Sequence, residues 1–212
     1  MKRALIVWGG PDFHEPEKGA HVVRGILEGE GFEVVVSPEY TSLATAGEYD
    51  LVMPQITGGE LDRESSLAFV NAIEKGTGVA GFHYALATTF HGNMWMRAVA
   101  GCTFAGHPGN NGVTYRVDPV KTRDPIMAGI ESFDHTSEQY FLHIDPTVEV
   151  LATTTFSGEH AFWLKDLVVP QVFKKRYGKG RVFYTALGHI ASELDSPPVR
   201  KILTRGMLWA TR

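Results

Sequence analysis

Three histidines stand where apolar segments of the chain end. His14 follows residues 3–8 by a short loop, His83 closes residues 78–83, and His189 follows residues 181–187. Unbroken apolar runs of this length are typical of strands buried on both faces of a parallel sheet. Ligands bind at the carboxyl edge of such sheets. We therefore expect the three imidazoles to converge at one edge.

Converging imidazoles suit either general acid–base catalysis or metal binding. His14, His83 and His189 can supply three nitrogen ligands and leave one position open, as in catalytic zinc sites. The alternative is metal-free acid–base chemistry, because the chain has no closely spaced histidine pair on one helix. We predict a divalent ion such as zinc or manganese as the cofactor. No nucleotide cofactor is expected, since the glycines of residues 177–180 lack the strand-to-helix context of a phosphate loop.

The segment 81–85, Gly-Phe-His-Tyr-Ala, has the pattern of a nucleophile elbow. Small residues on both sides of such a turn permit a strained backbone that projects one side chain. The projected residue is His83, so a covalent acyl-enzyme at this position is not expected. Cys102 has no comparable strand-and-turn context, and we do not expect it to act as a nucleophile.

Further polar and aromatic residues qualify for a site near the histidines. Glu138, in a predicted polar loop over residues 134–138, can act as a base or orient an imidazole; the alternative is a solvated carboxylate. His107 lies in a predicted rigid loop, and Tyr84 and Tyr140 can stack on a sugar. Other residues are expected to be structural, in the core or at the surface: His21, His91, His135, His143, His160, Trp8, Trp95 and Trp163.

The elements that must position these residues begin as alternating strands and helices. Predicted strands 3–8, 32–36, 50–54 and 78–83 alternate with helices 15–29 and 61–75. This order predicts an α/β fold with a doubly wound, mostly parallel, flavodoxin-like sheet. A short helix at 92–100 precedes a β-rich C-terminal half with strands 113–117, 148–155, 160–164, 168–177 and 181–187 and a final helix 197–210. No linker or repeat interrupts this order, so we expect one domain over residues 1–212.

Composition excludes several classes of protein. The 212 residues contain 20 basic and 24 acidic side chains, a net charge of −4, so a nucleic-acid partner is not expected. The longest basic run, residues 174–176, is expected to be a solvated strand edge. No apolar run is long enough for a membrane span, and the single cysteine fits a reducing, cytoplasmic location. The apolar and glycine-rich region 92–112 leaves room for a homo-oligomer.

Segments along nearly the whole chain resemble the trehalose-utilisation, ThuA-like family. They follow the family's order: Gly9-Gly10 with 13–15, 81–85, Trp95, 101–108, 124–126 with 129–130, 137–140, 177–184, 187–189 and Trp209. The resemblance implies a class I glutamine amidotransferase-like fold without glutaminase chemistry. His83 then stands at the nucleophile position of the amidotransferases and His189 roughly at their histidine position. The chain departs from the family at Ser137, where Asp is common, and at Cys102, where a second Gly is common.

The resemblance also implies a sugar-catabolic enzyme acting on trehalose-type or 3-keto-disaccharide substrates. A keto sugar carries an acidic proton beside its carbonyl, which a histidine or glutamate can remove. The catalytic residues would be His83, Glu138 and His189, with His14, Tyr84, His107 and Tyr140 binding the substrate. Elimination, hydration, isomerisation and glycoside cleavage all fit this step. The competing interpretation is a non-catalytic sugar-binding or regulatory module on a degenerate amidotransferase fold.

Overall fold

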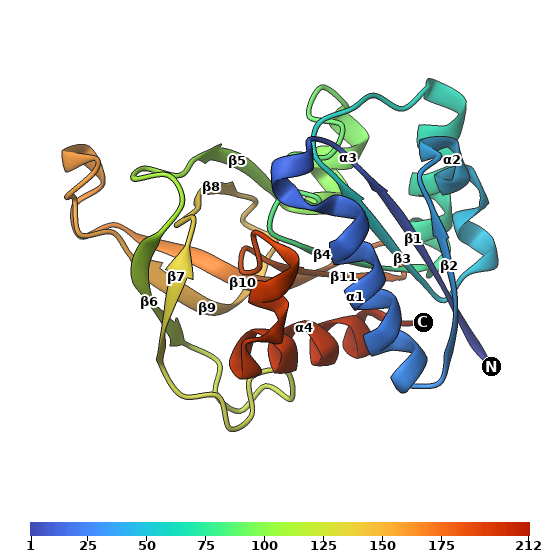
Figure 1. The fold of residues 1–212 in the computed structure, drawn as a ribbon. Helices are drawn as coiled ribbons and strands as arrows, with labels where there is room; N and C mark the ends of the chain where they lie inside the picture. Colours follow the sequence, from blue (N-terminus) through green and yellow to red (C-terminus); the bar gives the residue numbers. More distant parts are fainter.

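A nine-stranded mixed sheet forms the centre of the computed structural model, which describes all 212 residues (Figure 1). The strand order is β2-β1-β3-β4-β11-β10-β9-β6-β7. The first five strands are parallel and the remaining pairs are antiparallel. Their bounds are β1 Lys2–Gly9, β2 Phe32–Ser37, β3 Leu51–Ile56, β4 Gly78–Phe82, β6 Val113–Pro119, β7 Phe133–Ser137, β9 Glu149–Thr155, β10 Val168–Tyr177 and β11 Gly180–Thr185. A separate antiparallel pair joins β5 (Cys102–Gly106) to β8 (Phe141–Ile144).

Helices cover both faces of the parallel half. Helices α1 (Pro16–Gly29) and α4 (Pro197–Ala210) pack on one face, and α2 (Arg63–Lys75) and α3 (Met94–Ala100) pack on the other. Strand β1 shows why: Ala4 and Ile6 join the core under α1 and α4, whereas Leu5 and Val7 join the core under α2. A strand whose successive side chains alternate between two cores must be apolar throughout. The predicted α/β class with a largely parallel central sheet is confirmed.

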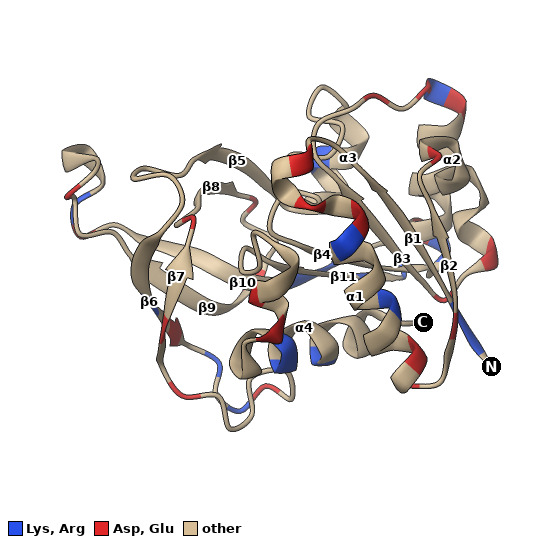
Figure 2. Cartoon of the chain, viewed as in Figure 1, with Lys and Arg blue, Asp and Glu red and all other residues tan.

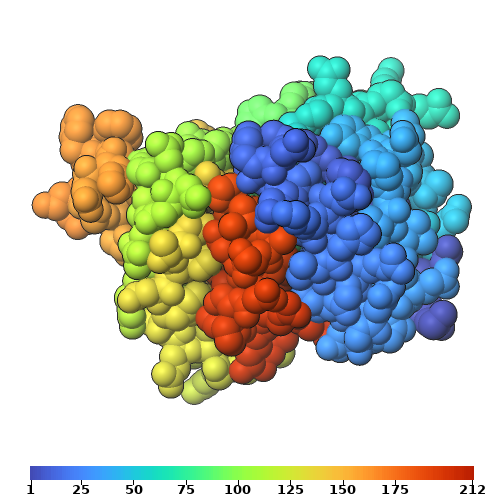
Figure 3. All heavy atoms as spheres, viewed as in Figure 1, coloured from blue at the N-terminus to red at the C-terminus, as the bar shows by residue number.

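The predicted strand at 160–164 is wrong. Residues Phe162–Leu164 form a single 3-10 turn within a loop that projects from the body of the molecule (Figure 3). Trp163 at its tip is 68% exposed, so its expected place in the core is also wrong. The segment is apolar in composition, but no neighbouring strand pairs with it, and composition alone does not supply a pairing partner.

The predicted loop at 134–138 is mostly a strand. Residues 133–137 form β7, which pairs with β6 in antiparallel register. His135 and Ser137 are buried while Asp134 and Thr136 are exposed, the two-residue alternation of a sheet with one solvated face. The polar composition concealed this strand because its inward-facing residues are themselves polar. Strands β5 and β8 were not predicted either.

The basic run at 174–176 is not a solvated edge. Strand β10 lies inside the sheet between β11 and β9, and both Lys174 and Lys175 are buried. Lys174 pairs with Asp124, and Lys175 Nζ lies 3.0 Å from a carboxylate oxygen of Asp145. Each buried cation therefore has a carboxylate partner, which is the usual condition for its burial.

Charged residues elsewhere lie mainly on helices and connecting loops, with both signs interspersed (Figure 2). No helix combines the length and the apolar character needed to cross a membrane.

Candidate functional site

Four neighbouring parallel strands deliver residues to one edge of the sheet. His14 follows β1, Thr57 follows β3, His83 follows β4 and His189 follows β11. Because these strands are adjacent and parallel, their carboxyl ends meet at the same edge. The chain winds outward from β1 to β2 and then returns to β3, so the strand order reverses beside His14. Such a reversal is the usual place for a ligand in an open α/β sheet.

His83 occupies a strained turn at the end of β4. Its φ angle is 50°, a left-handed conformation that non-glycine residues seldom adopt. The surrounding main chain holds it there: the His83 N–H donates to the Thr185 carbonyl at 2.7 Å, and the Tyr184 hydroxyl donates to the His83 carbonyl at 2.6 Å. A Cβ on Gly81 would lie 2.9 Å from the Leu86 side chain, so the turn needs glycine at this position.

The His83 ring is fully buried, and its hydrogen bonds fix its tautomer. Nδ1 lies 2.9 Å from the Ala186 carbonyl oxygen, which can only accept, so Nδ1 carries the proton. Nε2 lies 3.1 Å from a carboxylate oxygen of Glu138. A deprotonated Nε2 facing an ionised carboxylate would set two lone pairs against each other. A shared proton or a metal ion between the two atoms would remove this repulsion.

Glu138 reaches the cluster from the antiparallel half of the sheet. It directly follows β7, and the next residues are bound to neighbouring strands: Gln139 donates to Thr154 at 2.8 Å, and Gln171 donates to the Tyr140 carbonyl at 2.9 Å. These two hydrogen bonds hold the segment after β7 against β9 and β10. Burial alone would raise the pKa of Glu138, but the hydrogen bond from His83 and the nearby imidazoles outweigh it and lower the pKa to about 2.

His14 and His189 complete the group. His14 Nδ1 lies 2.8 Å from the Thr57 hydroxyl, and its ring stacks on Tyr84 with a centroid separation of 4.5 Å. Burial and the neighbouring imidazoles lower the pKa of His14 to about 3. His189 Nε2 lies 3.7 Å from Glu138, and neither ring nitrogen of His189 has a hydrogen-bond partner. Burial and the charge of His83 lower the pKa of His189 as well.

These four residues have the chemistry of a transition-metal site. His14, His83, Glu138 and His189 are all buried, and their candidate ligand atoms lie within 4.8 Å of one another. Tetrahedral ligands at about 2.1 Å from a zinc ion would be about 3.4 Å apart, so binding would require the widest pair to close by up to about 1.4 Å. Neutral imidazoles and an ionised carboxylate are the protonation states that such an ion needs. The unpartnered nitrogens of His189 fit the same interpretation.

The other predicted site residues lie beside this cluster. Tyr140 packs on His83 with a centroid separation of 4.2 Å, and Tyr84 stacks on His14. His107 follows β5 and places Nε2 4.0 Å from Glu138. Burial raises the pKa of Cys102 to about 12, which leaves its thiol protonated and unsuited to act as a nucleophile. Of the histidines expected outside the site, His21, His91, His143 and His160 are exposed and His135 is buried.

Thr57 and Glu193 are among the residues that make direct polar contacts to the cluster and were not predicted. Thr57, which follows β3, meets the same carboxyl-edge criterion as the histidines and could have been found by it. Glu193 lies in the 3-10 turn η4 (Ala191–Asp195) and binds the His189 backbone. Nothing in its local sequence distinguishes it from a surface carboxylate.

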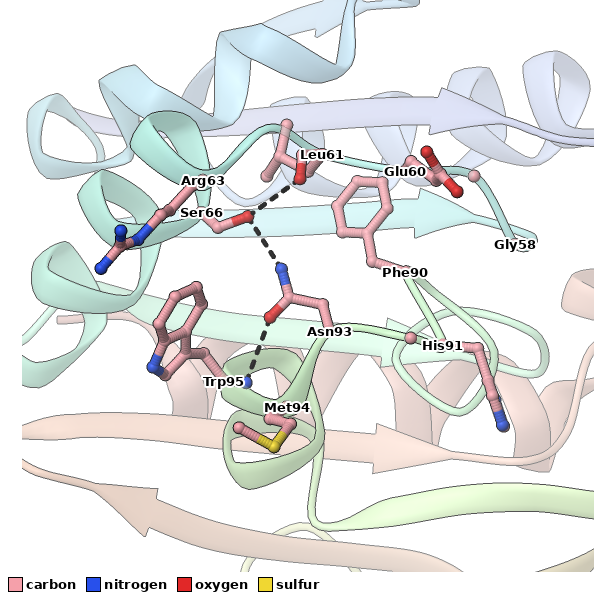
Figure 4. A pocket seen from close by; sticks show the side chains of 12 residues that line it. Gly58, Glu60, Leu61, Arg63, Ser66, Phe90, His91, Asn93, Met94 and Trp95 are labelled. Atoms are coloured by element: carbon pink, nitrogen blue, oxygen red, sulfur yellow. Dashed lines mark hydrogen bonds between the residues drawn. The ribbon is translucent and has the colours of Figure 1, made fainter.

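A cavity of about 540 Å³ is lined by the segments 58–66 and 90–95 and by none of the four cluster residues (Figure 4). Its walls continue two loops of the site: Gly58 and Glu60 come after Thr57, and Phe90 and Trp95 come after His83 and Tyr84 along the chain. The Asn93 amide in this wall is already bound to Ser66 and to the first turn of α3. The groups without such bonds are the exposed Glu60, Arg63 and His91 and the faces of the aromatic rings.

A family model described as trehalose utilisation, ThuA, matches residues 3–210. The chain belongs to the ThuA family. A solved ThuA-like protein from Parabacteroides merdae has 19% sequence identity and a TM-score of 0.81, covering 99% of this chain and 89% of its own. A cytoplasmic protein from Salmonella typhimurium has 11% identity and a TM-score of 0.69 over the full length of both chains.

The ThuA chain also resembles part of some larger proteins. A β-galactosidase from Bacillus circulans sp. alkalophilus matches with 16% identity and a TM-score of 0.55, covering 87% of this chain and 28% of its own. No curated protein sequence matches. At these identities the solved structures show a shared fold.

Proposed function

We propose that this ThuA protein is a sugar-catabolic enzyme that acts on an oxidised, keto form of a trehalose-type disaccharide with the help of a divalent metal ion. The family's link to trehalose utilisation supports the sugar. The observation that carries the chemistry is the buried pair of His83 Nε2 and Glu138, 3.1 Å apart, on a ring whose other nitrogen is already protonated. A metal ion can take the place between these two atoms, and His14 and His189 lie close enough to share it.

In this proposal His14, His83 and His189 hold the ion. When bound, a divalent ion supplies Lewis acidity that polarises the carbonyl of a keto sugar. Glu138 is assigned as the base, because its carboxylate lies among the imidazoles that would hold the ion. It accepts the proton from the carbon beside the carbonyl, which that carbonyl makes acidic. This step can precede elimination, isomerisation or glycoside cleavage.

Substrate binding is assigned to the residues that lie beside the cluster. His107 is the most exposed of the imidazoles near Glu138, with 30% of its side chain accessible. Tyr84 and Tyr140 pack against His14 and His83, but both side chains are buried in this structure, so the expectation that they stack on a sugar is not met and they shape the site instead. We assign the second sugar ring to the cavity of about 540 Å³ that has Phe90 and Trp95 in its wall, because its volume is within the usual range of small-molecule pockets.

Solvent deuterium exchange tests the proton-abstraction step directly. A 3-keto-disaccharide is incubated in D₂O with the protein and added Zn²⁺ or Mn²⁺, and proton NMR follows the signal beside the carbonyl. Wild type should exchange this proton faster than the protein-free control, and Glu138→Gln should lose at least about 100-fold of that rate. Glu159→Gln, an exposed carboxylate outside the site, is the matched control. Exchange at the background rate in wild type, or full activity of Glu138→Gln, would contradict the proposal.

A non-catalytic sugar-binding module is the second candidate. The observation in its favour is that all four cluster residues are buried and none lines the large cavity. Disaccharide binding by calorimetry, with no exchange and no product from oxidised or unoxidised sugars, would support it over the enzyme.

We further propose that the chain is a single domain with an amidotransferase-like arrangement of its parallel strands but without glutaminase activity. His83 takes the turn at which an amidotransferase would need a cysteine, and Cys102 is buried elsewhere with its thiol protonated. Glutamine hydrolysis above background would overturn this part.

A further inference from the structure

One partly buried carboxylate outside the cluster, Glu193, joins the segments that carry two of its members. Glu193 Oε2 accepts hydrogen bonds from the Ser137 hydroxyl at 2.8 Å and from the His189 backbone N–H at 2.9 Å. His135 Nε2 lies 3.5 Å from the same oxygen. Ser137 directly precedes Glu138, so a single oxygen atom links the residue before Glu138 to the backbone of His189.

This link joins parts of the chain that are not neighbours in the sheet. Ser137 ends β7 at the far edge of the sheet, whereas His189 follows β11 in its centre, four strand positions away. No backbone ladder pairs β7 directly with β11. The separation between His189 Nε2 and Glu138, 3.7 Å, therefore depends on contacts such as those of Glu193.

A second carboxylate, that of Glu15, links the turn η4 to the segment that follows β1. Glu15 directly follows His14, and its Oε2 accepts a hydrogen bond from the Ala191 N–H at 3.3 Å. The turn η4 is thus bound at one end to the segment of His14 and at the other to the segment of Glu138. Glu193 is the stronger of the two ties, because its side chain is only 15% exposed and its two hydrogen bonds are shorter. Hydrogen bonds to an ionised acceptor are about twice as strong as neutral ones.

Hydrogen-bond donors around Glu193 favour the ionised form of its side chain. Burial on its own would raise the pKa of Glu193, but the nearby His135 and the hydrogen bonds from Ser137 and the His189 backbone outweigh burial and lower it. A carboxylate that accepts two hydrogen bonds and has only 15% of its side chain exposed has little freedom to move.

We propose that Glu193 is a positioning residue of the metal and catalytic cluster, which sets the distance between His189 and Glu138 by holding Ser137 and the His189 backbone on one oxygen. This inference rests on the proposed function for its consequence, metal binding, but not for its geometry. Outer groups that orient metal ligands in this way commonly change metal affinity 10- to 100-fold when removed.

Three variants separate positioning from general stability. Glu193→Ala removes both hydrogen bonds. Glu193→Gln keeps an oxygen that can accept both while removing the charge. Asp195→Ala is the matched control, since Asp195 is a carboxylate in the same turn that is 71% exposed and pairs with Arg200 away from the cluster. Ser137→Ala, which removes one donor, serves if Glu193→Ala does not fold.

The first measurement is the affinity for Zn²⁺ and Co²⁺ by chelator competition, with the Co²⁺ absorption spectrum as a report of ligand geometry. Glu193→Ala should bind about 10- to 100-fold more weakly with an altered spectrum. Glu193→Gln should bind within a few-fold of wild type, Ser137→Ala should fall between them, and Asp195→Ala should match wild type. Equal affinity and an unchanged spectrum in Glu193→Ala, or in Ser137→Ala if it is the variant that folds, would overturn the inference.

A metal-free readout keeps this inference distinct from the proposed function. Amide hydrogen exchange of His189, measured by NMR on the apoprotein, should speed up at least 10-fold in Glu193→Ala and stay unchanged in Asp195→Ala. If wild type binds no metal, the proposed function is contradicted while the exchange result still decides the role of Glu193. Unchanged exchange at His189 would contradict the positioning role itself.

Discussion

Replacing Gly81 with alanine should destabilise the protein and disturb the turn that presents His83. The added Cβ would lie 2.9 Å from Leu86 Cγ and 3.0 Å from the Ala85 Cβ, where ordinary contact begins at 3.4 Å. The turn must shift by about 0.5 Å to relieve this overlap, and overpacking of this kind typically costs about 1–3 kcal/mol. For a domain of this size each kcal/mol lowers the melting temperature by about 2–4 °C, so a fall of about 2–12 °C is expected.

Differential scanning calorimetry measures this change, and Gly25→Ala is the matched control. Gly25 lies inside α1, is exposed, and has nothing within 4 Å of an added Cβ. Alanine in a helix interior is up to about 1 kcal/mol more favourable than glycine, so this variant should melt at a higher temperature than wild type. Replacing glycine with alanine should thus lower the melting temperature at position 81 and raise it at position 25. A Gly81→Ala protein as stable as wild type would refute the steric reasoning about the turn.

Three further predictions concern residues outside the cluster. Lys175→Met should lower the free energy of unfolding in urea by about 1–3 kcal/mol, because it leaves the Asp145 carboxylate and the Ala98 carbonyl without their donor; an unchanged unfolding midpoint would contradict the role of this pair. Cys102 should react with a thiol reagent at pH 8 about 1000-fold more slowly than a cysteine of ordinary pKa, since a pKa of about 12 removes nearly all of its thiolate, and rapid labelling of the folded protein would show that it is accessible. Phe162→Ser and Trp163→Ser should each change stability by less than about 0.5 kcal/mol, because both side chains are mostly exposed, whereas a large loss in dilute solution would show that another surface covers them.

The parallel half of the fold and its histidines were accessible to sequence reasoning for one physical reason. A strand buried on both faces must be apolar throughout, so its end is visible in the sequence, and parallel strands bring their ends to one edge. His14, His83 and His189 could be placed together on that basis alone. Thr57 follows from the same rule.

The antiparallel half was less predictable because its order depends on long-range pairing. Glu138 reaches the histidines only because the segment after β7 returns across β9 and β10. The polar alternation of β7 looked like a loop, and Trp163 looked like a core residue although it lies at the tip of a projecting loop. Lys175 looked like a solvated residue because its partner, Asp145, is 30 positions away in the sequence. None of these contacts leaves a local pattern.

The central claim is that the histidine–carboxylate cluster binds a divalent ion. The most direct test is the metal content of the protein, purified without a metal-affinity tag and equilibrated with Zn²⁺ or Mn²⁺, beside His189→Ala and the control His143→Ala. His143 is an exposed histidine on β8 that is not a member of the cluster. We predict about one ion per chain in wild type and His143→Ala, with loss in His189→Ala. No bound ion in wild type, or equal binding in all three proteins, would contradict the claim.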